Sequence, residues 1–184
     1  KECCVMARNY GIVPNFTTRN LKFIEQNRDW IEKYCGGVAV SVENESDVRR
    51  VLALGLKHLN LQYVVGLGNI EEVAKASDRT RLTLLGWKNT GRGNTVQPVE
   101  EDVVSVIESK YMIGIDTVLA KDLQPKLKEA GVKEWCYEIK EGTHSCYIDA
   151  VTNRIAPSSY CEDSQFVNLQ TTDSEAIKKE FARW

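Results

Sequence analysis

The feature that most constrains this chain is a regular alternation of short apolar segments with amphipathic stretches. The apolar segments are rich in β-forming residues and recur roughly every 20 to 30 residues, which predicts strands separated by helices. The strands expected are residues 12–18, 37–43, 59–66, 81–87 and 112–118. Connections this short are typical of parallel strands joined by right-handed crossovers. The pattern therefore predicts an α/β fold with a parallel sheet, either doubly wound or closed into part of a barrel.

Local start and stop signals place helices between these strands. Asn20 is an N-cap candidate for a helix that ends before Gly36 and Gly37, and Asn44 is a second N-cap candidate. The helix after Asn44 should carry Val48, Val51, Leu52 and Leu56 on one face. Further helices are expected around Cys3 and Cys4 and over residues 71–77, 100–109, 121–130 and 174–184.

The alternation stops near residue 134. Two short β-rich segments flank Thr152 and Asn153, which predicts a hairpin with a turn at that pair. We therefore expect residues 1–133 to form a partial βα barrel, and residues 134–184 to form a hairpin and helix extension packed on the same domain.

Length, charge and hydropathy restrict the class of protein. A chain of 184 residues suits one globular domain. Its 24 Lys and Arg residues against 26 Asp and Glu residues give a net charge of -2, which disfavours a nucleic-acid partner. No run approaches the roughly 20 apolar residues that cross a bilayer, and the first residues lack the apolar core of a signal peptide. The expectation is a cytoplasmic protein without a membrane partner.

Six cysteines are spread through the chain. Thiols stay reduced in the cytoplasm, so free thiols are favoured over a disulfide framework. No segment carries the closely spaced set that a zinc ion or an iron–sulfur cluster takes from one stretch of chain. Cys146 and Cys161 lie on either side of the predicted hairpin and are candidates to share a metal with another thiol, although a packing role is favoured.

Polar residues follow the predicted strands, where α/β proteins bind ligands. Ser41 and Glu43 share one side of a strand end, where a carboxylate could hold ribose hydroxyls, although helix capping is the alternative. Gly66 and Gly68 let backbone approach a ligand, or serve only a tight turn.

A third segment of this kind follows the fourth predicted strand. Trp87, Lys88 and Arg92 stand among glycines that suit an anion or an adenine edge, with loop geometry as the alternative. His58 and His144 have no nearby catalytic partner in the sequence, which favours a surface or packing role.

These segments resemble the radical S-adenosylmethionine (radical SAM) enzymes, which are built on a partial (β/α)6 barrel. GIVPNFTTRN at residues 11–20 is similar to the family's third strand, and VAVSVE at 38–43 is similar to the fourth. NLQYVV at 60–65 and LLGWK at 84–88 followed by GRG at 91–93 look like the fifth and sixth. The resemblance covers roughly residues 1 to 95, and the hairpin between Cys146 and Cys161 is similar to the C-terminal extensions of some members.

The resemblance implies S-adenosylmethionine (SAM) bound at the carboxyl ends of the strands, acting on an unknown small-molecule or peptide substrate. The residues implied or suggested for that site are Thr18, Asn20, Ser41, Glu43, Gly68, Glu71, Trp87, Lys88 and Arg92.

Two family motifs are missing. The C-x3-C-x2-C segment that binds a 4Fe-4S cluster is absent, as is the Gly-Gly-Glu motif of the second strand. We therefore expect a truncated C-terminal part of a radical SAM-type enzyme that does not cleave SAM by itself. The alternatives are a non-catalytic barrel-like binding or regulatory module and a lyase or aldolase that uses Lys88 or Lys121.

Overall fold

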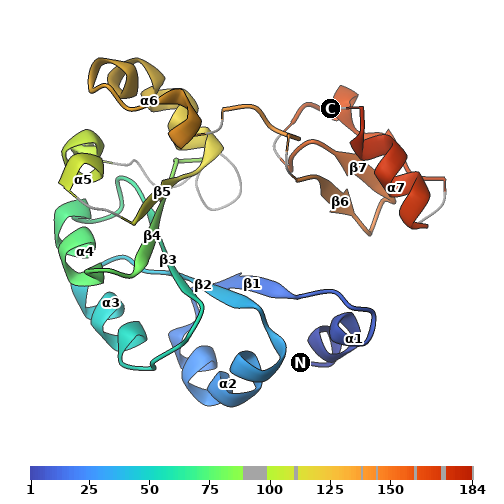
Figure 1. The fold of residues 1–184 in the computed structure, drawn as a ribbon, viewed down its shortest axis with the longest axis horizontal. Coiled ribbons are helices and arrows are strands. Elements are labelled where there is room, and N and C mark those ends of the chain that lie inside the picture. Colours follow the sequence, from blue (N-terminus) through green and yellow to red (C-terminus); the bar gives the residue numbers. More distant parts are fainter. Residues whose placement is uncertain are drawn as a thin grey trace. The chain divides into compact units, whose positions relative to one another are not determined.

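The computed structural model describes residues 1–88, 99–109, 112–137, 139–143, 145–159, 161–170 and 173–183. It divides into two compact units, Lys1–Tyr137 and Glu138–Trp184 (Figure 1). The first unit contains a five-stranded parallel sheet alternating with helices, and the second contains a small three-stranded antiparallel sheet. The α/β class predicted from the sequence is confirmed.

All five predicted parallel strands are present in the first unit, each shorter than its apolar run. They lie side by side in the order in which they occur along the chain, and every neighbouring pair is parallel. The runs are longer than the strands because apolar residues beyond the strand ends, such as Val42, also stay buried. The strands are β1 (Asn15–Thr18), β2 (Gly37–Ser41), β3 (Leu59–Val64), β4 (Arg81–Leu85) and β5 (Ile113–Ile115).

Helices connect these strands, and the two asparagine caps are confirmed. The Asn20 side chain accepts a hydrogen bond from Phe23 N at 2.9 Å, and the Asn44 side chain accepts one from Asp47 N at 3.0 Å. The helices are α1 (Glu2–Asn9), α2 (Leu21–Tyr34), α3 (Glu45–Leu52), α4 (Ile70–Ser77), α5 (Val103–Ser109) and α6 (Thr117–Glu129). A short 3-10 turn, η2 (Glu134–Cys136), follows α6.

Three details of the helix predictions were wrong. Leu56 lies beyond the end of α3, because the chain turns away through Gly55, whose φ is +61°. The helix expected from residue 100 begins at Val103. The helix expected from residue 121 begins at Thr117, because Asp116 caps it by accepting a hydrogen bond from Leu119 N at 2.8 Å.

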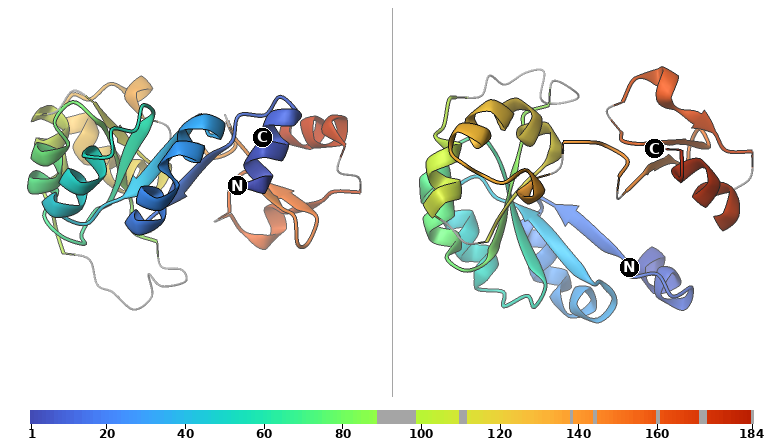
Figure 2. Two further views of the ribbon diagram at one scale, coloured as in Figure 1. Left: turned by 90° about the horizontal axis from the view of Figure 1, so that it is seen from below. Right: turned by 45° about the horizontal axis from the view of Figure 1, so that its top comes forward.

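The crossover helices α2, α3, α4 and α5 all lie on one face of the sheet (Figures 1 and 2). This arrangement follows from strands that lie in chain order. Each right-handed connection leads to the next strand in the same direction along the sheet, so each connecting helix lies on the same face. Side chains alternate between the two faces of a strand. The most buried residues on the helix-facing side of β2, β3 and β4 are apolar and at most 4% exposed: Val38, Val40, Leu61, Tyr63, Leu82 and Leu84.

The opposite face of the sheet carries the alternate residues and is largely polar. We call it the open face. It consists of Asn15, Thr17, Gly37, Ala39, Ser41, Asn60, Gln62, Val64, Arg81, Thr83, Leu85 and Gly114. Within the described part of this unit, no crossover helix lies on the open face (Figure 1).

The second unit confirms the predicted hairpin. β6 (Tyr147–Asp149) pairs antiparallel with β7 (Arg154–Ala156). The Asp149 carboxylate accepts hydrogen bonds from Val151 N at 2.9 Å and from the Thr152 hydroxyl at 2.6 Å, and these bonds lower the pKa of Asp149.

Three further elements complete the second unit. The sequence did not predict the third strand, β8 (Val167–Asn168), which pairs with β7. A 3-10 turn, η3 (Asp163–Gln165), precedes β8, and the terminal helix is α7 (Ser174–Phe181).

Among the described residues, no helix combines the length and the apolar character needed to cross a lipid bilayer.

Leu61 tests the assignment of the helix-facing side of the sheet. It is fully buried in the central strand β3, so Leu61→Ala should lower the free energy of unfolding by about 2–5 kcal/mol. Ile12 is 60% exposed, and Ile12→Ala should change it by no more than about 0.5 kcal/mol. Urea denaturation followed by circular dichroism measures both, and equal losses would place Leu61 outside the core.

Candidate ligand-binding site

The candidate site lies along one edge of the parallel sheet, where the five strands end. Because the strands run in the same direction and pair in order, their carboxyl ends meet at that edge. The residues there are Thr18 at the end of β1, Ser41 at the end of β2, the Gly66–Gly68 turn after β3, Lys88 after β4 and Asp116 after β5.

Thr18 and Asn20 take part in the turn into α2. The Thr18 hydroxyl accepts a hydrogen bond from Asn20 N at 3.0 Å, while the Asn20 side chain caps the helix. The described hydrogen bonds of both side chains therefore stabilise the turn between β1 and α2.

Ser41 and Glu43 have different surroundings. Ser41 pairs in register with Gln62 on the open face, and the described residues offer its hydroxyl no hydrogen-bond partner. Glu43 forms an ion pair with Arg19, which connects the ends of β1 and β2. The capping alternative holds for Asn44 but not for Ser41, because Asn44 accepts the hydrogen bond at the start of α3.

Other residues of the chain approach the backbone of Gly68 closely. A Cβ atom at this position would lie 2.6 Å from the Glu43 carbonyl oxygen and 3.4 Å from the Tyr63 hydroxyl. Contact between two neighbouring loops therefore accounts for the glycine. Glu71 lies in the exposed first turn of α4, where its backbone N–H donates to the Asn69 side chain at 3.1 Å.

Glu101 organises the loop after β3. Its carboxylate accepts hydrogen bonds from the Tyr63 hydroxyl at 2.9 and 3.1 Å, from Ile70 N at 2.6 Å and from Gly66 N. Burial, followed by the hydrogen bond to Glu101, raises the pKa of Tyr63. This role was not predictable from the sequence, because an acidic residue before an apolar run is typical of an ordinary first helical turn.

Lys88 is paired with a residue that the sequence did not indicate. Its Nζ atom lies 3.5 Å from Oδ2 of Asp116, and both side chains are less than one third exposed. The other Asp116 oxygen accepts hydrogen bonds from Gly86 N at 2.9 Å and Leu119 N at 2.8 Å. Asp116 therefore holds Lys88 at the junction of β4, β5 and α6. Trp87 beside it is half-buried.

The edge therefore combines charged and neutral polar groups. The Arg19–Glu43 pair lies at the ends of β1 and β2, and the Lys88–Asp116 pair lies at the ends of β4 and β5. The Ser41 hydroxyl lies at the end of β2, two residues before Glu43. A ligand that carries both signs of charge, together with hydroxyl groups, matches this arrangement. Arg92 and His144 lie outside the described residues.

The cysteines form no metal site in the part of the chain that the structure describes. The Cys161 thiol donates to the Ser158 carbonyl at 3.1 Å, and burial raises the pKa of Cys146. In the part of the chain that the structure describes, no group of three or more His, Cys, Asp and Glu residues is placed to hold a metal ion.

Comparison of this chain with known protein families, with curated proteins and with solved structures finds no match. The case for a function therefore rests on the geometry of the chain itself.

Glu101→Ala tests the loop after β3. It removes the acceptor for a buried tyrosine hydroxyl and two backbone N–H groups, so the free energy of unfolding should fall by about 2 kcal/mol or more. Glu100 is 93% exposed, and Glu100→Ala should leave that free energy within about 0.5 kcal/mol. Guanidinium denaturation compares the two variants, and equal stabilities would contradict the role given to Glu101.

Cys35 offers a test of burial at the end of α2. Its sulfur lies 4.0 Å from that of Cys4, and burial raises the pKa of Cys35 to about 11. Only about one molecule in a thousand should carry the Cys35 thiolate at pH 8, and the thiolate is the reactive form. Iodoacetamide at pH 8 should therefore modify the exposed Cys3 well before Cys35, as peptide mass spectrometry can measure. Modification of Cys35 as fast as that of Cys3 would contradict its burial.

Proposed function

We propose that residues 1–137 form a section of a partial (β/α) barrel of the radical SAM type and bind SAM across the carboxyl ends of their strands. The observation that carries the proposal is the order of the strands, combined with crossover helices on one face only. A doubly wound sheet reverses its strand order and places helices on both faces. A barrel keeps chain order and leaves one face for its interior.

The groups at the sheet edge suit the chemistry of SAM. Its methionyl part carries an ammonium and a carboxylate, and its ribose carries hydroxyl groups. Arg19 and Glu43, which form an ion pair with each other, carry the complementary charges, and the Ser41 hydroxyl on the open face has no hydrogen-bond partner among the described residues. Trp87 and Lys88 at the end of β4 would border the adenine. Thr18, Asn20 and Gly68 support this proposal only indirectly, by fixing the loops around the site.

A 4Fe-4S cluster does not fit the described residues. Such a cluster needs three thiolates close together, and no described group of three metal-ligating side chains is present. The activity proposed for this chain is therefore binding of SAM alone.

A non-catalytic binding or regulatory module is the second candidate. The observation that favours it is that the hydrogen bonds of Thr18 and Asn20 and the close approach at Gly68 have structural explanations. The open face would then serve a ligand other than SAM.

Isothermal titration calorimetry with SAM tests the proposal. The chain should bind SAM saturably, and Glu43→Gln should weaken binding about tenfold, because a charged hydrogen-bond partner is lost. Loss of its exposed ion pair with Arg19 should cost little stability. Glu45→Gln is the matched control, because Glu45 lies two residues away and pairs with Arg49 in the first turn of α3. Saturable binding that Glu43→Gln leaves unchanged would contradict the site, and no binding by the folded chain would favour the non-catalytic module.

A further inference from the structure

We propose a second binding site on the open face, at the amino-terminal ends of the strands, that takes a carboxylate or phosphate group of a small molecule through Arg81. This site lies at the opposite end of the strands from the proposed SAM site and does not depend on it.

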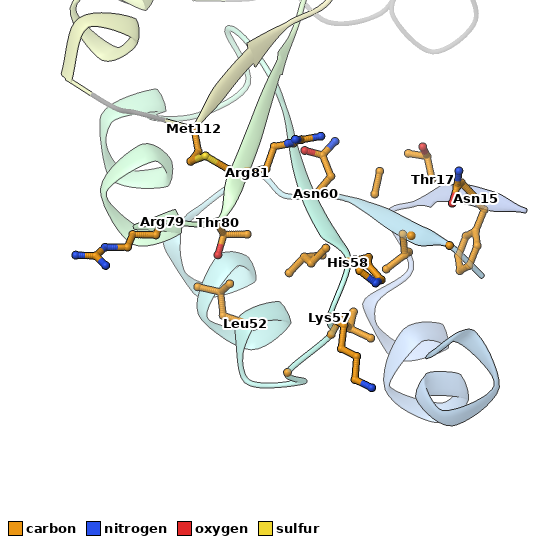
Figure 3. A pocket seen from close by; sticks show the side chains of 18 residues that line it. Asn15, Thr17, Leu52, Lys57, His58, Asn60, Arg79, Thr80, Arg81 and Met112 are labelled. Carbon is orange, nitrogen blue, oxygen red and sulfur yellow. The ribbon is translucent and has the colours of Figure 1, made fainter. Parts of the chain in front are cut away.

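A cavity of about 860 Å³ lies at this end of the sheet (Figure 3). The open-face residues that line it come from four strands. They are Asn15 and Thr17 of β1, Gly37 and Ala39 of β2, Asn60 of β3 and Arg81 of β4.

The register of the sheet brings these residues into a row. Thr17 pairs with Ala39, Ala39 pairs with Asn60, and Asn60 pairs with Arg81. Ala39 and the nearby Gly37 have almost no side chain, so little side-chain volume fills the cavity above β2. A hydroxyl from Thr17 stands on one side of β2, and the amide of Asn60 and the guanidinium of Arg81 stand on the other.

The residues that line the cavity are positively charged or neutral. Arg81 is the one charged residue within the five described parallel strands, and β4 is an interior strand with a partner on each side. None of the 18 residues that line the cavity is acidic. Lys57 and Arg79 also line it and add to the positive potential.

The Arg81 side chain is placed to use this potential. In Figure 3 it lies beside Asn60, whereas the Arg79 side chain extends away on the opposite side. The described residues form no ion pair with Arg81, which is exposed to solvent. A guanidinium beside an amide, with no carboxylate partner in the described part of the chain, suits a planar carboxylate or a phosphate, which it can bind through two parallel hydrogen bonds.

NMR titration of the 15N-labelled chain with inorganic phosphate and, separately, with acetate tests the proposal at constant ionic strength. At least one anion should shift the amide signals of Thr17, Ala39 and Asn60 saturably. Arg81→Gln should weaken that binding at least tenfold. Arg79→Gln removes the same charge two residues away and should change the affinity by no more than about twofold. Saturation by phosphate alone would assign a phosphate ester, and saturation by acetate alone would assign a carboxylate.

Two results would overturn the proposal: no saturable shift with either anion, or equal losses in the Arg81→Gln and Arg79→Gln variants. Ala39→Leu is a second variant that keeps Arg81 and fills the cavity above β2, so it should weaken anion binding as strongly as Arg81→Gln. Glu43→Gln should leave anion binding unchanged. Failure of this site and failure of the SAM site are therefore distinguishable.

Discussion

Parallel pairing of five strands in chain order is the constraint on which the first unit depends. It places the crossover helices on one side, so the strands must present apolar residues to that side and are free to present polar residues to the other. β3 illustrates this division, because the buried Leu61 and Tyr63 alternate with Asn60 and Gln62. Both proposed binding sites follow from the same division, one at each end of the open face.

Three carboxylates organise the loops at the carboxyl ends of the strands. Glu43 forms an ion pair with Arg19. Glu101 accepts hydrogen bonds from the Tyr63 hydroxyl and from two backbone N–H groups. Asp116 forms an ion pair with Lys88 and also caps α6. Hydrogen bonds to a charged acceptor are stronger than those between neutral groups, so a few acidic side chains can fix loops that have little core of their own. Such fixed loops would organise the proposed binding edge before a ligand arrives.

The sequence predicted what local chemistry determines. The five strands follow from their apolar runs, and the caps at Asn20 and Asn44 bond to backbone only three residues away. It did not reveal contacts between distant residues, such as Tyr63 with Glu101 or Lys88 with Asp116, because these depend on strand order and register. It also could not single out Arg81, whose significance depends on the cavity beside it.

The sheet is covered by its own crossover helices on one face, and its open face is accessible. The most direct measurement compares maleimide labelling of Gln62→Cys and Leu61→Cys in the native protein, read peptide by peptide by mass spectrometry. These neighbouring positions of β3 point to opposite faces, so the thiol of Gln62→Cys should react rapidly and that of Leu61→Cys should be protected. Equal protection at both positions would show that the open face is covered and would contradict the account.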